Sequence, residues 1–490
     1  MKKSKTSIQD QAPTLFDFEI DPEPLSGEVT SHAGLPSVAE TFRAIGGMKS
    51  VARHLNGKQR DRGYTDAEMA ESFLLLLSAG GDHLDDFDLL RGDRGLARLL
   101  DHEIPSSSKA RQFLYTFHDE ELMEQRPDRE EQAAWVPEES ERLMGLARVN
   151  TDAVRSIDKG IEKVSEKGVT RGTIDADATI IDSNKREALW HYKQGRGYQP
   201  HLAYWVERDL IVADQFRDGN VPAAMDPLSL AKAAFEALPE TVTEFAYRAD
   251  SASYQHDLLN WLRGENKWDR PRCPVTFAIS ADMTPQLKAV IEGMEESAWE
   301  SLKNRDGSEP REEGITREWA EIPFVPEAEG VKKDSKPDRY IAIRVTRHQQ
   351  LLFDDGNAVR YYAIVTNHEG RGEEAIHWHR EKAGTVEYVH DVTKNDLGAG
   401  IMPCGRFGAN AAWYRLCLLT YNLLSAFKQI GLPEKLHKAR PKKLRFRLLC
   451  LGAKIATHAR KTMLKVAAAV ESIGELLVLR SHLPRLLHSG

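Results

Sequence analysis

The chain has 490 residues, which is too long for one ordinary domain and predicts about two to four. Its formal net charge is −8, and an evenly spread acidic charge would argue against a nucleic-acid partner. The charge is uneven, however, because the segment from Lys435 to Lys465 is strongly basic. The distribution of charge therefore says more about partners than its sum.

The cysteine content and the absence of long apolar segments indicate the cellular compartment of the protein. The four cysteines are scattered and show no CxxC spacing of the kind that binds zinc: Cys273, Cys404, Cys417 and Cys450. Such sparse cysteines fit a reducing cytoplasm. The first residues are not followed by the apolar run of a signal peptide, and no segment is apolar for long enough to span a bilayer. We expect a soluble cytoplasmic protein with no membrane partner.

The N-terminal third has a helical pattern. Residues 1–30 are polar and proline-containing and predict a disordered tail, whereas 31–165 predict a helical region. Thr65 and Gly80 suit the start and end of one helix. Serines 106–108 begin another helix, whose first turn carries Lys109 and Arg111. That start resembles the opening of a DNA-recognition helix, and an ordinary capped surface helix is the alternative.

The periodicity changes to that of strands at about residue 169. Residues 172–182 alternate β-branched and polar side chains and predict a strand on which Asp175 and Asp177 share one face. Two carboxylates on one face of a central strand are unfavourable unless a cation neutralises them. Both Asp175 and Asp177 are therefore candidates for a cation-binding carboxylate on this strand.

The elements that follow have a recognisable order. A predicted hairpin over 201–216 is followed by a helix at 227–238, a strand ending at Asp250, a helix at 255–263 and a strand at 274–280. Three antiparallel strands, helix, strand, helix, strand is the order of a ribonuclease H-like domain. In that α/β fold the first and fourth strands are neighbours, so Asp177 or Asp175 would face Asp250.

Residues 291–367 interrupt this order. They predict a β-rich insertion with strands near 339–345 and 360–367, which divides the ribonuclease H-like domain into 166–290 and 368–430. The stretch from Arg380 to Asn395 predicts one helix, with three valines facing a core. Glu387 and Lys394 lie seven residues apart on one stripe of it. A metal bound beside a phosphate would suit this pair, and a solvated charge pair is the alternative.

The last part of the chain combines an apolar helix with a basic tract. Residues 410–427 predict a core helix, and 431–490 predict a basic helical region, a helix pair with one basic face. That face either contacts phosphates or is simply solvated. The cations that we single out in it are Lys442, Lys443, Arg445 and Arg447.

Four short motifs resemble those of bacterial insertion-sequence transposases of the DDE superfamily, in particular those with a β-strand insertion before the glutamate. The motifs are Asp177-Ala-Thr179, Arg248-Ala-Asp250-Ser251, the strand 362–367, and Gly384-Thr-Val-Glu387 with Lys394. Their Asp-x-Thr spacing favours Asp177 over Asp175. Arg380 and Lys382 depart from the family's usual spacing before the glutamate, and His379 stands where a tyrosine is often found.

The resemblance implies a transposase that cleaves DNA and joins its 3′ hydroxyl to a second DNA. Asp177, Asp250 and Glu387 would hold two Mg²⁺ ions, for which Mn²⁺ can substitute, with Asp175 as a further ligand. Four basic residues would contact DNA phosphates: Lys394, Arg380, Lys382 and Arg248. The N-terminal helices and basic C-terminal region would bind terminal inverted repeats, target DNA and a second subunit, giving a homodimeric synaptic complex at the bacterial nucleoid.

Three other interpretations stay open. A nuclease of the same fold would cut DNA without joining it, and a decayed enzyme would only bind it. Glu387 and His390 are also spaced like an iron-binding pair in a helical bundle, but that site needs a second such pair, and the sequence offers no convincing one.

Overall fold

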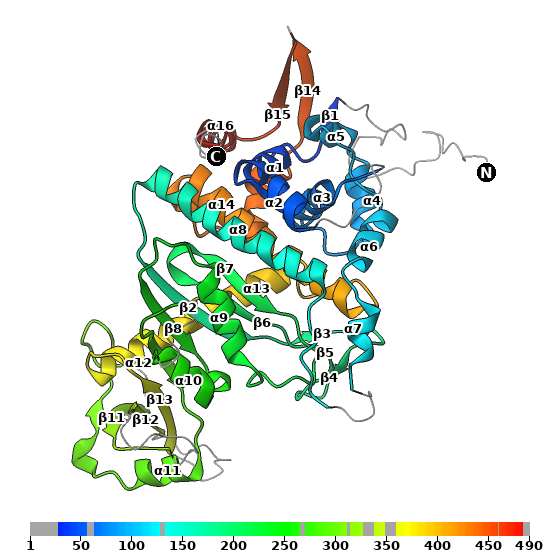
Figure 1. Ribbon diagram of the computed structural model, residues 1–490. Helices are drawn as coiled ribbons and strands as arrows, with labels where there is room; N and C mark the ends of the chain where they lie inside the picture. Colours follow the sequence, from blue (N-terminus) through cyan, green and yellow to red (C-terminus); the bar gives the residue numbers. More distant parts are fainter. Residues whose placement is uncertain are drawn as a thin grey trace, which may run out of the picture.

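A computed structural model describes residues 28–55, 63–127, 133–264, 270–310, 314–326, 338–347, 359–458 and 460–483. The predicted tail at residues 1–30 lies almost wholly outside these ranges. The described chain is a mixed α/β structure in which helices surround a large mixed sheet (Figure 1). Among the described residues, none of the helices is both long and apolar enough to cross a membrane.

Within the described residues the large sheet has nine strands, in the order β10-β11-β12-β13-β9-β8-β2-β6-β7. The half of the sheet that carries Asp177 consists of β2 (Arg171–Ala178), β6 (His201–Trp205), β7 (Leu210–Gln215), β8 (Glu244–Ala249) and β9 (Thr276–Ser280). Strand β2 is antiparallel to β6 and parallel to β8, and Ala176 lies opposite Ala249. The predicted neighbourhood of the first and fourth strands is thereby confirmed, and Asp177 and Asp250 follow at the same edge.

The strands of residues 291–367 extend this same sheet. They are β10 (Glu300–Ser301), β11 (Ile315–Ile322), β12 (Arg339–Arg347) and β13 (Val359–Thr366), and β13 pairs with β9. The two strands predicted here are thus present. Helix α12 (Gly372–Arg380) covers them through a small apolar cluster that includes Trp319, Ile341 and Ile376. The segment therefore returns the chain to the end of β8, close to Asp250.

In the described part of the chain, eight helices come before β2 in sequence. They are α1 (Leu35–Ala44), α2 (Gly47–His54), α3 (Asp66–Ala79), α4 (Asp86–Arg91), α5 (Arg94–Leu100), α6 (Ser107–Tyr115), α7 (Glu120–Glu124) and α8 (Glu141–Ser165). The predicted caps of α3 are confirmed: Thr65 and Glu68 form a capping box, and Gly80 ends the helix at φ 104°. Ser106 caps α6 by accepting from the backbone N–H of Lys109.

Helix α14 (Phe407–Gly431) joins the N-terminal helices to the sheet. Almost all of its side chains are buried, and it packs against α8, α3, α1, α6 and β7. Polar bonds fix this packing, because Asn422 accepts from the Ile211 backbone N–H at 2.7 Å and donates to Asn150 at 2.9 Å. The N-terminal helices and the sheet consequently share one continuous hydrophobic core. Three further helices lie along the sheet strands: α9 (Pro227–Ala237), α10 (His256–Leu262) and α11 (Pro285–Glu292).

The helix predicted from Arg380 to Asn395 is wrong in its continuity. Helix α12 ends at Arg380, a 3₁₀ turn covers Glu381–Gly384, and α13 begins afresh at Val386 and runs to Asp396. Thr385 is non-helical between them (φ −113°, ψ −86°), and its hydroxyl donates to the buried Asp175. A tertiary bond thus overrides helix propensity at this residue. The three valines of α13 are buried, as predicted.

The helix pair predicted for the basic C-terminal region is also wrong. A short α15 (Pro441–Leu444) and a π-helical turn (Arg445–Leu449) lead into two antiparallel strands, β14 (Ala453–His458) and β15 (Lys461–Val466), and only then into α16 (Val470–His482). The alternation of Lys454, Ile455 and later residues has the period of a strand. A second small sheet, of β3 (Ile181–Asp182), β4 (Leu189–Trp190) and β5 (Arg196–Tyr198), follows β2.

Candidate active site

Two aspartates stand at the end of neighbouring parallel strands. Asp177 is the seventh residue of β2, and Asp250 comes directly after β8. Desolvation raises the pKa of Asp250, which Lys382 lowers and the Asp177 charge raises further. Desolvation likewise raises the pKa of Asp177 against the opposing effect of Lys382. The two carboxylates thus repel each other in one partly desolvated site, where a cation is favourable.

Lys382 already supplies one positive charge to this site. Its Nζ lies 3.3 Å from Asp177 Oδ1, and the residue is only 7% exposed. It lies in the 3₁₀ turn that separates α12 from α13. Lys382 therefore faces the carboxylates rather than the outer surface, which changes its predicted role as a simple DNA-phosphate contact.

Helix α13 contacts β2 and carries Glu387 in its first turn. Thr385, just before the helix, donates to Asp175, and His390 Nε2 lies 3.7 Å from Asp177 Oδ2. Lys394 Nζ donates to the carbonyl of Ile180 at 2.8 Å. Glu387 lies one turn before His390 and two turns before Lys394, so the three share one side of α13. Glu387 stays exposed, as a carboxylate at the mouth of a site would.

Asp175 has a different role from Asp177. Its two oxygens accept from Arg248 Nε at 2.7 Å and Nη2 at 2.9 Å, and both residues are almost completely buried. Arg248 also donates to the Trp378 carbonyl at 2.8 Å and to Glu381 at 2.5 Å. We therefore reassign Asp175 from metal ligand, and Arg248 from DNA contact, to one internal ion pair that fixes α12 to the strands.

Two buried histidines, His201 and His390, lie near Asp177, which the sequence pattern did not predict. Among the residues that the structure describes, neither ring nitrogen of His390 has a hydrogen-bond partner, nor does Nδ1 of His201 on β6. Burial, with Lys394 and Lys382, lowers the pKa of His390 to about 3, so its imidazole is neutral. The i, i+3 spacing of Glu387 and His390 was the available signal. In the structure His390 lies beside Asp177, which belongs to a strand and not to a second helix.

The remaining basic residues predicted near the glutamate and on α6 lie toward the outside. Arg380, at the end of α12, is exposed, and Lys394 is half-buried. Lys109 and Arg111 are exposed on α6, where Lys109 donates to Gln112 at 3.2 Å. Arg111 also lines a groove together with Lys185 and residues 400–403.

The cations singled out in the C-terminal region are largely occupied within the chain. Arg447 bonds Glu475 at 2.7 Å, and Lys442 lies 3.2 Å from Asp396. Arg445 donates to the carbonyls of residues 77 and 78 at the end of α3. Arg445 and Arg447 thus have partners within the chain, which makes them weaker candidates for DNA contact than Lys443, which is exposed.

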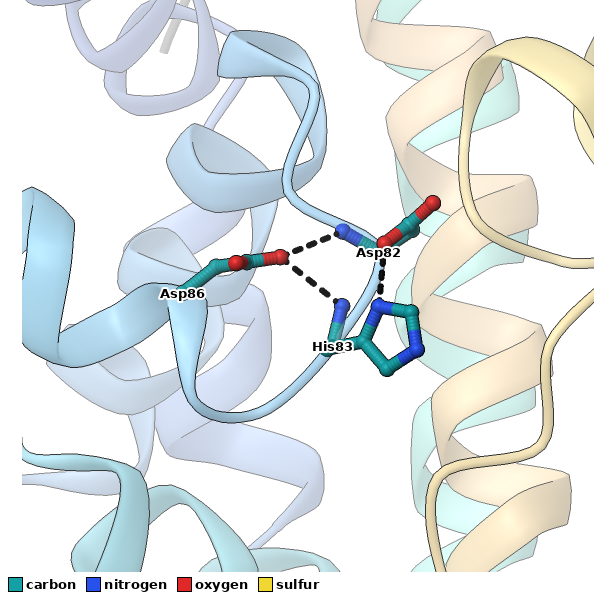
Figure 2. Close-up of side chains that lie close together, drawn as sticks. All are labelled: Asp82, His83 and Asp86. Atoms are coloured by element: carbon teal, nitrogen blue, oxygen red, sulfur yellow. Dashed lines mark hydrogen bonds and ion pairs between the residues drawn. The ribbon is translucent and has the colours of Figure 1, made fainter.

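A second acidic group lies between α3 and α4. Asp82, His83 and Asp86 gather there (Figure 2), with their possible ligand atoms within 4.8 Å of one another. Asp86 accepts from the backbone N–H groups of Asp82 and His83, each at 3.0 Å, and His83 contacts Asp82 through Nδ1. These local bonds account for the cluster as a turn before α4.

Comparison with known proteins places the chain. The family described as transposase DDE domain group 1 matches residues 15–487. The chain belongs to this family. No curated protein matches it. Among solved structures, the chain is similar to the piggyBac transposase in a cryo-EM synaptic complex with hairpin DNA, with a TM-score of 0.44 and 9% identity over 94% of this chain and 82% of that one.

Transposases of this family normally use divalent metal ions. The donor set fits such ions, because Asp177 and Asp250 repel each other and a bound cation would relieve that repulsion. Lys382 already offsets part of it as an internal cation. Carboxylate oxygens are the ligands that Mg²⁺ and Mn²⁺ prefer.

Proposed function

We propose that the protein binds the terminal inverted repeats of an insertion sequence and catalyses both DNA cleavage and strand transfer, with Asp177, Asp250 and Glu387 as the catalytic carboxylates. One observation carries this proposal. Strands β2 and β8 end side by side with Asp177 and Asp250 at their ends, and His390 of α13 lies 3.7 Å from Asp177, which supports Glu387, one turn earlier on α13, as the third carboxylate. The order of β7, β6, β2, β8 and β9 suits a ribonuclease H-like catalytic domain.

The proposed reaction has two phosphoryl-transfer steps. A water oxygen attacks phosphorus at the end of the element, and the bond from phosphorus to the 3′ oxygen breaks, which leaves a 3′ hydroxyl. That hydroxyl attacks a phosphorus of the target DNA, and the target's own 3′ oxygen leaves with a proton. In the first step, water replaces the 3′ oxygen on phosphorus. In the second step, the 3′ hydroxyl of the element replaces the 3′ oxygen of the target. Water and the two DNAs are therefore the only reactants needed.

Two Mg²⁺ ions are the proposed cofactor, and Mn²⁺ would substitute. Asp177, Asp250 and Glu387 would hold them, and such ions supply charge stabilisation and an activated water. Asp175 is not in this set because Arg248 and Thr385 occupy its oxygens. Lys382 would have to share Asp177 with a bound ion.

DNA would reach the site beside basic residues that come before and after Glu387 in the chain. Lys394 and Arg380 flank Glu387 on its two sides and would hold phosphates near the cleaved bond. Lys109 and Arg111 at the start of α6 and Lys443 after α14 are further proposed contacts. A homodimer that brings two ends together, and a place at the bacterial nucleoid, complete the proposal.

Cleavage and joining of a DNA that carries the sequences flanking the gene would test the catalytic site. Wild type with Mg²⁺ should give end-specific cuts and joined products. Glu387→Gln, Asp177→Asn and Asp250→Asn should each lower cleavage by about a thousandfold or more while leaving DNA binding largely intact. Glu295→Gln, which changes an exposed glutamate before β10, is the matched control and should cleave normally.

The same assay separates the second candidate function. A nuclease of this fold would make the cuts and release them without any joined product. Cleavage that survives in Asp250→Asn or Glu387→Gln would contradict the assignment of the site itself.

A further inference from the structure

Strands β14 and β15 form an arm that stands clear of the rest of the molecule (Figure 1). Six residue pairs join the two strands in antiparallel register, from Ala453 with Val466 to His458 with Lys461. The base of the arm is attached to the body, because β1 (Val29–Thr30) pairs with β14 and Ile455 is 2% exposed. At about 3.4 Å per residue, the paired part is roughly 20 Å long.

The arm is basic throughout, in a chain whose net charge is −8. Residues 452–470 contain no aspartate or glutamate. Its exposed cationic side chains are Lys454, Arg460, Lys461 and Lys465, with His458 beside them. In the part of the chain that the structure describes, none of these four cations forms an ion pair, whereas Arg440, Lys442 and Arg447 just before the arm all do.

The strand register concentrates this charge on one face. Lys454 lies directly opposite Lys465, and His458 opposite Lys461, with Met463 between them on the same face. Like charges directly across two strands destabilise a sheet. On the other face, Thr457 accepts a hydrogen bond at 2.8 Å from Arg98 of α5, so a further cation lies beside the arm. An unpaired, self-repelling row of cations is stabilised by a polyanion.

We propose that the β14–β15 arm binds double-stranded DNA, with the Lys454–Lys465 face against the phosphates of a groove. This inference rests on the proposed function for the identity of the polyanion. The major groove of B-DNA admits a two-stranded β-ribbon, and a ribbon of this length and charge matches that shape. The arm thus replaces Arg445 and Arg447 as the DNA-contacting part of the basic region.

Salt-dependent binding of the full chain to duplex DNA tests the arm. The variant Lys454→Gln, Arg460→Gln, Lys461→Gln and Lys465→Gln removes four charges. Each phosphate contact contributes about −0.9 to the slope of log affinity against log salt, so the slope should shrink by roughly 2 to 4. Affinity at about 0.1 M salt should fall at least about tenfold. A variant with arginine at the three lysines should keep the wild-type slope.

The control carries the same change of charge elsewhere. Lys159→Gln, Lys163→Gln, Lys167→Gln and Lys288→Gln alter exposed lysines of α8, the loop after it, and α11, and should leave the slope within about 1 of wild type. The double variant Arg460→Gln, Lys461→Gln affects only the tip of the arm, away from its packed base, and should lower the slope by about 1 to 2.

Three results would overturn the proposal: a wild-type slope in both arm variants, an equal loss in the control, or a loss confined to single-stranded DNA. Failure of the proposed function would look different. Loss of the arm should raise the DNA concentration that metal-dependent cleavage requires, whereas Glu387→Gln should abolish cleavage at every DNA concentration. A wild type that never cleaves would refute the function and leave the slope comparison valid.

Discussion

Replacing Asp175 with alanine should destabilise the protein although Asp175 is not one of the proposed metal ligands. The change leaves the Arg248 guanidinium, which is 1% exposed, without the two hydrogen bonds that it donates at 2.7 and 2.9 Å. Breaking a buried ion pair by removing one partner costs about 3–5 kcal/mol. Arg248 keeps its bonds to Trp378 and Glu381, so we expect the lower end, about 3 kcal/mol.

Asp177→Asn should behave in the opposite way. Desolvation raises the pKa of Asp177, so its charge is unfavourable to the fold, and a neutral amide of the same shape should cost about 1 kcal/mol or less. Cleavage should nevertheless be lost. Urea unfolding followed by circular dichroism gives the midpoints, compared at unchanged slope, and the DNA assay gives the activities.

A double variant sharpens the comparison. Asp175→Leu with Arg248→Met removes both charges, and Glu381 still has Arg305 as a partner, so the double variant should be more stable than Asp175→Ala alone. The reasoning is refuted if Asp175→Ala has the wild-type midpoint but no cleavage while Asp177→Asn still cleaves. That result would make Asp175 the metal ligand.

Three further predictions concern other charged groups. Lys382→Met should raise Mn²⁺ affinity about tenfold or more in calorimetry, because the ammonium 3.3 Å from Asp177 repels a second cation; unchanged affinity would contradict this. Burial lowers the pKa of His102, but its bonds to Glu71 and the backbone outweigh that and raise it. The stabilisation is complete below the unfolded pKa of about 6.5 and is lost as pH rises through the higher folded pKa, so the unfolding midpoint should fall over that window in wild type and less in His102→Gln. Arg445→Ala should cost about 1–3 kcal/mol by uncapping α3, measured by urea unfolding, with exposed Lys443→Ala near zero as its control.

The strand pattern was sufficient to predict that Asp177 and Asp250 lie at the ends of two neighbouring strands. Alternation over 172–178 and a strand ending at residue 250 fixed which side chains emerge where, and an established strand order made the two strands neighbours. The separate role of Asp175 could not be predicted, since its partner Arg248 lies 73 residues away and only the register places them opposite each other.

Local patterns failed where tertiary contacts decide. Nothing in the residues 380–395 shows that Thr385 leaves the helix to bond Asp175. Residues 453–466 alternate with the period of a strand, but the many cations of the basic tract obscured this pattern, so the two strands were not predicted. Whether a given arginine is internal or free depends on distant carboxylates such as Glu475.

Helix α14 has a consequence for the order in which the protein can fold during synthesis. The N-terminal helices bury their apolar faces against α14, which the ribosome completes only at Gly431. Helices α1, α3, α6 and α8 therefore emerge long before their shared partner exists, with apolar surface still exposed. A nascent chain stopped before residue 407 should be protease-sensitive in these helices and bind chaperones, and it should become protected once α14 has left the exit tunnel.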